Sequence, residues 1–190
     1  MLQTDLPTTA RLLDLPQEPW GNGKGSTRLI DAHPSLDADE WDWRLSLATL
    51  AENSEFSPAG GVVRIVTIAS TGPIQLNLNG TCHELSLGMQ AQFLDSDHAE
   101  ITLGGQEQYA LNLMVRRGRG YGSVETEQLR GQRVFEPTDL WHRIVVLDGS
   151  VRLEDGTELG ALSVINPAQS RLVLQADQAL LAHIVVAAIH

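Results

Sequence analysis

The chain has 190 residues, 42% of them hydrophobic, so it can bury a core of ordinary size as one large domain or two small ones. Thirteen basic and 24 acidic residues give a net charge of −11, which repels nucleic acid and anionic membranes. No apolar run is long enough for a membrane span, and the N-terminus lacks the pattern of a secretory signal. With its single cysteine, the sequence predicts a cytoplasmic protein without disulfides.

The first distinctive segment is WGNGKGSTR, at positions 20–28. It fails the requirements of a phosphate-binding P-loop, because Lys24 is followed by Gly25 and the next residues read as an extended strand rather than a helix. Its three glycines, spaced two apart, also miss the dinucleotide-binding pattern. We therefore predict a tight turn that leads Thr27 and Arg28 onto a strand.

Beyond this turn, apolar and polar residues alternate with the period of a β-strand. Turn-forming pairs such as Asn-Gly, Gly-Gly and Asp-Gly separate the segments. Many short strands at this spacing predict an all-β fold, a sandwich or a barrel. The alternating segments are 43–50, 62–68, 74–78, 99–103, 110–115, 143–147 and 180–186.

A weak internal repeat links the two halves of the chain. The segment that begins with RIVTI at Arg64 resembles the one that begins with RIVVL at Arg143, and both read strand, turn, strand, turn, strand. Further along, the same alignment places His183 where Asn112 lies in the first half. The repeat predicts two related β units, 1–120 and 121–190, with the second completed by intermixed strands.

Several motifs, in order, resemble the HutD/Ves family: PWGNGKGSTR at 19–28, WRLSLA at 43–48 with Phe-Ser at 56–57, Arg64, and LNLMVRRG at 111–118. The resemblance implies a bicupin, with two cupin-like (jelly-roll, RmlC-like) barrels in one chain, which agrees with the repeat. It also implies a role like that of HutD in bacterial histidine utilisation, where the protein is thought to bind a small pathway metabolite and to modulate flux or expression.

Strand alternation indicates which side chains could form a site. Arg44 and Ser46 share one face of their strand, Arg64 lies on a partly apolar face, and Asn112 shares a face with Met114 and Arg116. A half-buried arginine needs a protein carboxylate or a bound anion. The predicted ligand-binding residues, with Trp20 and Trp43 as walls, are Asn22, Thr27, Arg28, Arg44, Ser46, Arg64 and Asn112.

The alternative for these arginines is a structural role. Arg44 and Arg64 could pair with nearby acids such as Asp42 or Glu55, or could face water. For one arginine that reading is the stronger one. It weakens for the set, because the polar residues come from separate motifs that all match the family pattern.

Neither a metal nor a nucleophile is predicted. The histidines are isolated, and His83-Glu84 lacks the second histidine of the cupin metal motif, so we expect no metal and no cofactor. Cys82 and His83 are adjacent in a strand and point to opposite faces, which argues against an activated pair. No catalytic residue is assigned. The isolated histidines are His33, His83, His98, His142, His183 and His190.

The expected function is metal-independent binding of a small carboxylate metabolite, of the urocanate, formylglutamate or formiminoglutamate class, with a regulatory output. A metal-free cupin isomerase or lyase that acts on a similar acid is the alternative, although the sequence offers no clear general base beyond His183. A third reading has a vestigial pocket and contact with protein partners. Nucleic acid and membranes are not expected as partners, and a homodimer is left open.

Overall fold

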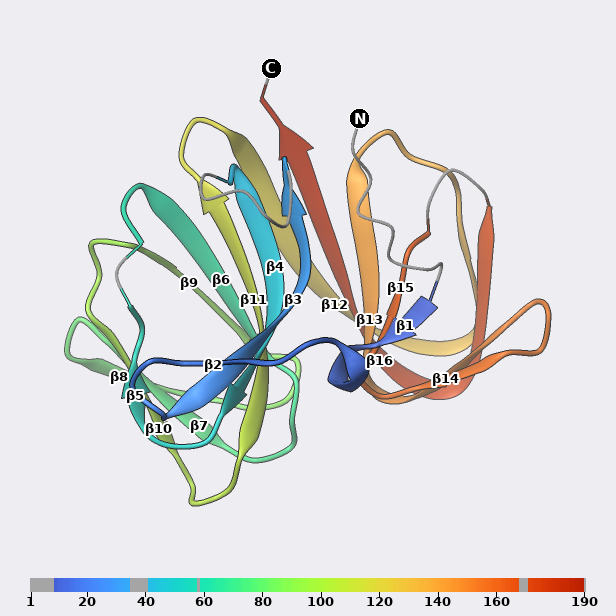
Figure 1. Cartoon of the computed structure of the whole chain (residues 1–190). Coiled ribbons are helices and arrows are strands. Elements are labelled where there is room, and N and C mark those ends of the chain that lie inside the picture. Colours follow the sequence, from blue (N-terminus) through green and yellow to red (C-terminus); the bar gives the residue numbers. More distant parts are fainter. Residues whose placement is uncertain (1–8, 35–40, 58, 168–170, 190) are drawn as a thin grey trace. The chain divides into compact units, whose positions relative to one another are not determined.

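The computed structural model describes residues 9–34, 41–57, 59–167 and 171–189 (Figure 1). Apart from the three-residue 3-10 helix η1 (Leu12–Asp14), its regular structure is all strand, which confirms the all-β prediction. None of the described helices has the length and apolar character needed to cross a membrane. The chain divides into two compact units, which we call the N-terminal unit (described residues Leu15–Tyr121 and Ile189) and the C-terminal unit (9–14 and Gly122–Ala188).

The N-terminal unit contains two antiparallel sheets. The first has six strands in the order β2 (Glu18–Pro19), β3 (Gly25–His33), β4 (Trp43–Leu50), β11 (Gln108–Arg116), β6 (Val62–Ile68) and β9 (Gln90–Leu94). The second has four strands in the order β5 (Ser54–Glu55), β10 (Ala99–Leu103), β7 (Ile74–Leu78) and β8 (Thr81–Leu85).

A single apolar cluster lies between these two sheets. The cluster contains Ala48, Val66 and Ala110 from the six-stranded sheet and Leu76 and Ile101 from the four-stranded sheet. We call the face that carries the first three residues the inner face. Because side chains alternate along a strand, this assignment fixes which other residues of β4, β6 and β11 point inward.

The C-terminal unit is built on one sheet in the order β1 (Thr9–Arg11), β15 (Ser163–Ile165), β13 (Trp141–Leu153), β16 (Leu172–Ala188) and β12 (Gly120–Phe135), with β14 (Glu158–Gly160) paired to β13. The register of β13 with β16 shifts at Val146/Asp148 and at Gly149/Arg152. Such irregularities bend strands, and Leu174 and Leu181, which lie on either side of the two shifts in β16, belong to one core cluster.

The two units share a strand order. In the N-terminal unit β9, β6, β11 and β4 are neighbours, and in the C-terminal unit β15, β13, β16 and β12 are neighbours, with the same sequence order within each set. Asn112 pairs with Val66, and His183 pairs with Ile144. Within the described residues no sheet closes into a barrel.

The register corrects one detail of the sequence alignment. If His183 corresponds to Asn112, the residue that corresponds to Arg64 is His142 rather than Arg143, because Arg64 and His142 each lie two positions before the paired Val66 and Ile144. A shift of one residue reverses the face of a strand. Arg143 therefore points away from Ile144 and the core cluster, and its guanidinium carbon lies 4.7 Å from the ring centre of Trp141.

Candidate functional site

The glycine-rich segment forms the hairpin between β2 and β3. The amide of Trp20 donates to the carbonyl of Gly25 at 2.9 Å, and the amide of Gly23 donates back to the carbonyl of Trp20 at 2.9 Å. Gly23 has φ 72°, a conformation that favours glycine. Asn22 is exposed, and its side-chain oxygen accepts a hydrogen bond from the amide of Lys24 at 3.0 Å. Its carboxamide thus completes the turn.

The hairpin places the indole of Trp20 over Gly25. A Cβ atom at Gly25 would lie 2.8 Å from Cζ3 of Trp20 and would also overlap the carbonyl oxygen of Thr49. The indole nitrogen donates to the hydroxyl of Thr27 at 2.8 Å, and the ring packs against the apolar cluster of the N-terminal unit. Gly25 therefore allows an aromatic ring to cover the backbone.

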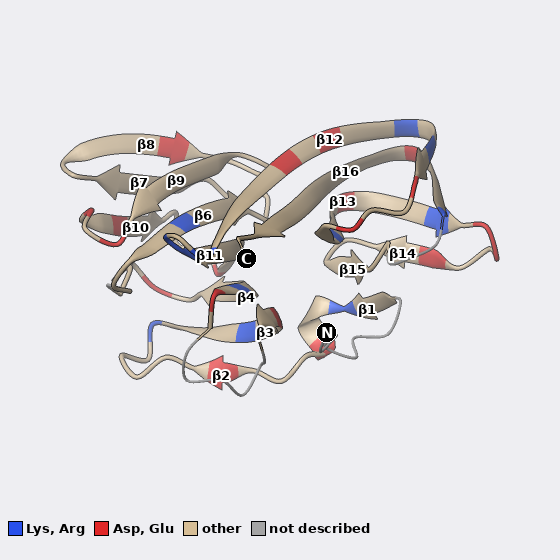
Figure 2. Ribbon diagram, turned by 90° about the horizontal axis from the view of Figure 1, so that it is seen from above, with Lys and Arg blue, Asp and Glu red and all other residues tan. Residues whose placement is uncertain are grey.

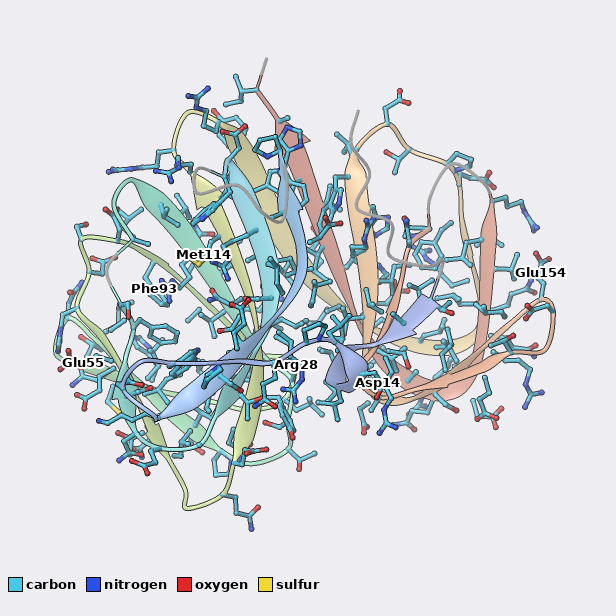
Figure 3. The ribbon with its side chains drawn as sticks, in the orientation of Figure 1. Asp14, Arg28, Glu55, Phe93, Met114 and Glu154 are labelled. Atoms are coloured by element: carbon cyan, nitrogen blue, oxygen red, sulfur yellow. The ribbon has the colours of Figure 1, made fainter. Side chains whose placement is uncertain are left out.

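Two rows of paired residues cross the inner face of the six-stranded sheet. Residues paired across a sheet lie on the same face, so each row is a set of neighbours. The first row runs Ala32, Arg44, Met114, Arg64, Phe93, and the second runs Leu29, Ser46, Asn112, Val66, Ala91. Figure 2 marks basic segments on β4 and β6, and Figure 3 shows Phe93 and Met114 between the strands of this unit.

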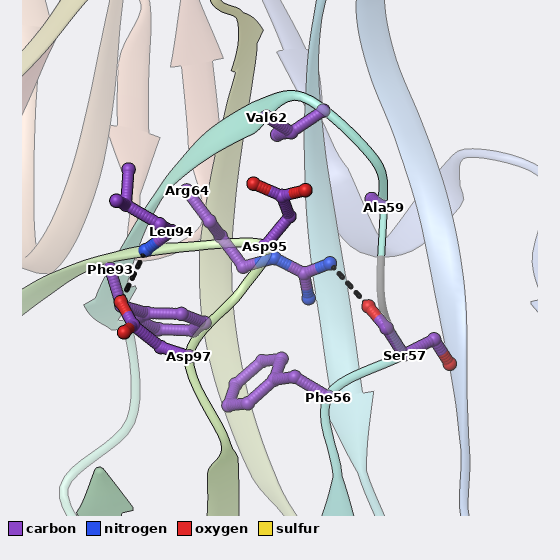
Figure 4. Close-up of a pocket in the computed structure, with 9 residues that line it drawn as sticks. All are labelled: Phe56, Ser57, Ala59, Val62, Arg64, Phe93, Leu94, Asp95 and Asp97. Carbon is purple, nitrogen blue, oxygen red and sulfur yellow. Dashed lines mark hydrogen bonds between the residues drawn. The ribbon is translucent and has the colours of Figure 1, made fainter. Parts of the chain in front are cut away.

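Arg64 is buried, with 9% of its surface exposed. Its Nη2 donates to the carbonyl of Ser57 at 3.1 Å, and its guanidinium carbon lies 5.0 Å from the ring centre of Phe56 and 5.8 Å from that of Phe93 (Figure 4). Burial, and next the charge of Arg44, lower the pKa of Arg64 to about 10. The two arginines are thus close enough to repel each other.

Arg44 is partly buried, and its Nε atom is inaccessible to solvent and has no hydrogen-bond partner among the described residues. Its guanidinium carbon lies 5.9 Å from the ring centre of Trp41. Burial lowers the pKa of Arg44, and the charge of Glu18 opposes that shift. No carboxylate in the described part of the chain forms an ion pair with Arg44 or Arg64.

Asn112 lies between these arginines, one row away on the central strand β11. Its Nδ2 lies 3.7 Å from the sulfur of Met114, whereas its Oδ1 is buried without a hydrogen-bond partner in the described residues. Ser46, its neighbour in the second row, is also buried. Among the described residues, the inner face therefore combines two arginines, which form no ion pair, with an amide oxygen that has no hydrogen-bond partner.

A pocket opens beside Arg64 (Figure 4). Its volume of about 10 Å³ is enough for roughly one water molecule. Asp95 also lines it, but its carboxylate accepts a hydrogen bond from the amide of Gly61 at 2.7 Å and lies 3.7 Å from Nη2 of Arg117. The lining residues are Phe56, Ser57, Ala59, Val62, Arg64, Phe93, Leu94, Asp95 and Asp97.

Besides Asn22 in its exposed turn, two of the sequence-predicted residues point away from the inner face. Arg28 pairs with Leu47, on the opposite face of β3, and its guanidinium donates to Thr49 and Gln17, at 2.9 Å in both cases. Trp43 also faces away from the Arg44 side. The physical reason is the same for both, because consecutive strand residues point to opposite faces. Since Thr27 and Arg44 lie on the inner face, their neighbours Arg28 and Trp43 point to the other face.

The structure adds Arg116 and Trp41 to the site. Arg116 shares the inner face with Asn112 and Met114, its Nε donates to the carbonyl of Trp41 at 2.9 Å, and its guanidinium carbon lies 5.2 Å from the Trp41 ring centre. Alternation along β11 already indicated the face of Arg116. No sequence pattern indicated Trp41, because it lies outside a strand and contacts Arg44 and Arg116 only in the folded chain.

Across the described residues, no three His, Cys, Asp or Glu side chains are grouped as metal ligands. Cys82 is exposed on the edge strand β8. The polar groups of the site in the N-terminal unit are guanidinium, amide and hydroxyl groups, which lie beside aromatic rings. Such groups bind an anion by charge-assisted hydrogen bonds.

Comparisons with known proteins agree with this architecture. The sequence model of the HutD family matches residues 13–184. Protein Ves of Citrobacter koseri is 32% identical over 154 residues, which cover 75% of this chain and 80% of that protein. The structure of HutD from Pseudomonas fluorescens SBW25 superposes with a TM-score of 0.78 at 20% identity, covering 96% of this chain and 98% of that one.

A cupin 2 conserved barrel domain protein from Leptotrichia buccalis superposes with a TM-score of 0.67 at 12% identity, over 98% of this chain and all of that one. This likeness concerns the fold alone and identifies it as cupin-like. The family match spans most of the chain and both units. The chain belongs to the HutD family.

Proposed function

We propose that this protein is a metal-independent binding protein for a small carboxylate metabolite, with a regulatory role in the cytoplasm. The observation that carries the proposal is the pair Arg44 and Arg64, which share the inner face and repel each other, without an ion-paired carboxylate in the described residues. A buried charge without a partner is unfavourable. A bound anion removes that cost and gains charge-assisted hydrogen bonds.

In this proposal each polar group has one role. The guanidiniums of Arg44 and Arg64 hold a carboxylate, and Ser46 and Thr27 line the same face. Asn112 Oδ1 accepts a hydrogen bond from an N–H or O–H group of the ligand. The rings of Phe56 and Phe93 hold the Arg64 guanidinium from the apolar side.

Family membership supports the proposed ligand class in addition to the arginines. One relative, 36% identical over 70 residues, is an uncharacterized 21.2 kDa protein encoded in the hutC 3′ region of Pseudomonas putida. Together with the HutD family name, this supports a role in histidine utilisation. We therefore propose an acid of the urocanate, formylglutamate or formiminoglutamate class as the ligand.

The strand orders support a further part of the proposal, a bicupin origin for the fold. Duplication of one cupin-like unit is expected to give two units with the same four-strand order and the same sequence order of those strands. It also explains the equivalent pairing of Asn112 and His183. In this proposal the conserved feature is the strand order rather than a closed barrel.

Calorimetric titration of the full chain with the three acids tests the function. We expect binding of at least one acid, and we expect Arg64→Ala to weaken it by about 3 kcal/mol, or more than roughly 100-fold. Arg152→Ala, at an exposed position of the C-terminal unit, is the matched control and should bind as the unmodified chain does. Equal affinity for the Arg64→Ala variant, or no binding of any acid, would contradict the proposal, and turnover without added metal would favour an isomerase or lyase.

A further inference from the structure

The core-facing side of the C-terminal sheet carries two histidines at the positions that Arg64 and Asn112 occupy in the N-terminal unit. His183 on β16 pairs with Ile144 of β13, as Asn112 pairs with Val66. His142 pairs with Val185, as Arg64 pairs with Met114. Ile144 and Leu181 belong to the core cluster of the unit, so both imidazoles lie on the core-facing side of the sheet.

These histidines form a cluster with an acidic and an aromatic side chain of β12. Nε2 of His183 lies 3.1 Å from Oε2 of Glu127. The ring of Phe135 lies 5.4 Å from the His183 ring and 6.2 Å from the His142 ring, centre to centre, and the two imidazoles are 5.9 Å apart. Three rings and one carboxylate are therefore gathered in a small region.

The imidazoles of this cluster lie near both acidic and basic groups. Burial and then the charges of His183 and Arg143 lower the pKa of His142 to about 4, and burial also lowers the pKa of His183, although Glu127 opposes that shift. Both imidazoles are thus neutral at neutral pH. The charged groups around them are Glu127, its exposed partner Arg133, whose Nε lies 3.7 Å from Glu127 Oε1, and also Glu125 and Arg143.

The cluster also has unused hydrogen-bonding capacity. Nε2 of His142 is buried and has no hydrogen-bond partner in the described part of the chain. Glu127 keeps 34% of its side chain exposed and His183 keeps 13%, so solvent reaches the cluster. A carboxylate and neutral imidazole nitrogens accept hydrogen bonds from N–H groups. The Phe135 ring adds an apolar surface, and the guanidinium carbon of Arg133 lies 5.7 Å from its centre.

We propose that the C-terminal unit holds a second small-molecule site, formed by Glu127, Phe135, His142 and His183, which takes a planar, weakly basic nitrogen heterocycle with N–H donors. A ligand with N–H donors is favoured there, because the carboxylate of Glu127 and the imidazole nitrogens accept hydrogen bonds. The ligand's N–H groups donate to Glu127 and to an imidazole nitrogen, and its ring packs on Phe135. In this proposal the two units take ligands of different charge, an acid in the N-terminal unit and a weak base in the C-terminal unit.

Imidazole is the probe for this site, added to the full chain at neutral pH and followed by NMR of the histidine ring protons. We expect the signals of His142 and His183 to shift together and to saturate, while those of exposed His98 stay unchanged. Glu127→Gln should weaken imidazole binding at least roughly tenfold, since a charged acceptor is lost. Glu136→Gln, at an exposed position of the same unit, is the matched control.

Phe135→Leu keeps an apolar side chain and provides a second variant, which should lose a smaller part of the affinity, roughly threefold to tenfold. Arg64→Ala should leave imidazole binding unchanged, so failure of the arginine site and failure of this site give different results. The proposal is wrong if imidazole leaves the His142 and His183 signals unmoved, if Glu127→Gln binds it equally well, or if acetate produces the same shifts.

Discussion

Arg44 and Arg64 both pair with Met114, one from each side, so their side chains leave the same face of the sheet with one strand between them. Neighbouring strands are about 4.8 Å apart, which places the two backbones about 10 Å from each other. Arginine side chains are long enough to converge over that distance. Burial lowers the pKa of Arg64 most, and the further lowering by the charge of Arg44 is the electrostatic result of this register.

Replacement of Arg44 should therefore stabilise the ligand-free protein. Arg44→Gln removes a half-buried charge and its repulsion of Arg64, and we expect a gain of about 1 kcal/mol in the free energy of unfolding, measured by urea denaturation. The same variant should bind the carboxylate ligand more weakly. Arg152→Gln, at an exposed position, should change neither quantity. A clear loss of stability for Arg44→Gln would show that its charge is already balanced.

A carboxylate introduced at Asn112 should act as an internal counter-ion. Asn112 is the diagonal neighbour of both arginines on the inner face, so the side chain of Asn112→Asp lies within reach of their guanidiniums. We expect a higher melting temperature and at least roughly tenfold weaker binding of the acid, because the new carboxylate competes with it. Asn112→Ala separates the two effects, since it removes the amide without adding charge. Unchanged affinity in Asn112→Asp would place the anion elsewhere.

Gly25 tests the role of the glycine-rich hairpin. Gly25→Ala should cost about 2 kcal/mol, because the added methyl group meets Cζ3 of Trp20 and the carbonyl of Thr49. Tryptophan fluorescence should shift as the Trp20 indole is displaced. Gly21→Ala is the matched control in the same loop, since a Cβ atom there has no neighbour within 4 Å. Equal stability of the two variants would mean that the backbone relaxes without moving the ring.

Arg28 should have no part in binding, although it belongs to the same glycine-rich motif as Thr27. Arg28→Ala removes hydrogen bonds to Gln17 and Thr49 on the opposite face and should cost about 1 kcal/mol of stability. Its affinity for the carboxylate ligand should stay within about twofold of the unmodified chain, a change of only about 0.4 kcal/mol. A much larger loss of affinity in calorimetric titration would contradict the assignment of faces.

The free energy of unfolding should fall as the pH drops from 6.5 towards 4, through the buried imidazole of His142. The pKa of this group is about 4 in the folded chain against 6.5 for the ordinary group, so the unfolded chain binds the proton more readily over this range. After allowance for solvent screening we expect a contribution of about 1 to 2 kcal/mol. His142→Gln should flatten the pH dependence, measured by urea denaturation, whereas exposed His98→Gln should leave it intact.

Sequence alone was sufficient for several of the strands, because their alternation is a local property, whereas β12 lies in a stretch without clear alternation and was not predicted. Segments 43–50 and 62–68 were predicted with the bounds that β4 and β6 have in the structure, and the motifs identified the family that the comparisons then showed. Alternation within β4 and β11 also put Ser46 beside Arg44 and Arg116 beside Asn112. These are relations inside one strand, fixed by the period of two.

Relations between strands required the tertiary structure. The neighbours of β11 are β4 and β6, and this pairing, together with its register, brings Arg44, Arg64 and Asn112 onto one face. The register of β3 with β4 places Arg28 on the opposite face. The register of β13 with β16 makes His142, rather than Arg143, the counterpart of Arg64. Sequence does not encode register locally, because register results from the packing of the whole sheet against its core. The contacts of Trp41 and Glu127 likewise depend on chain segments that meet only after folding.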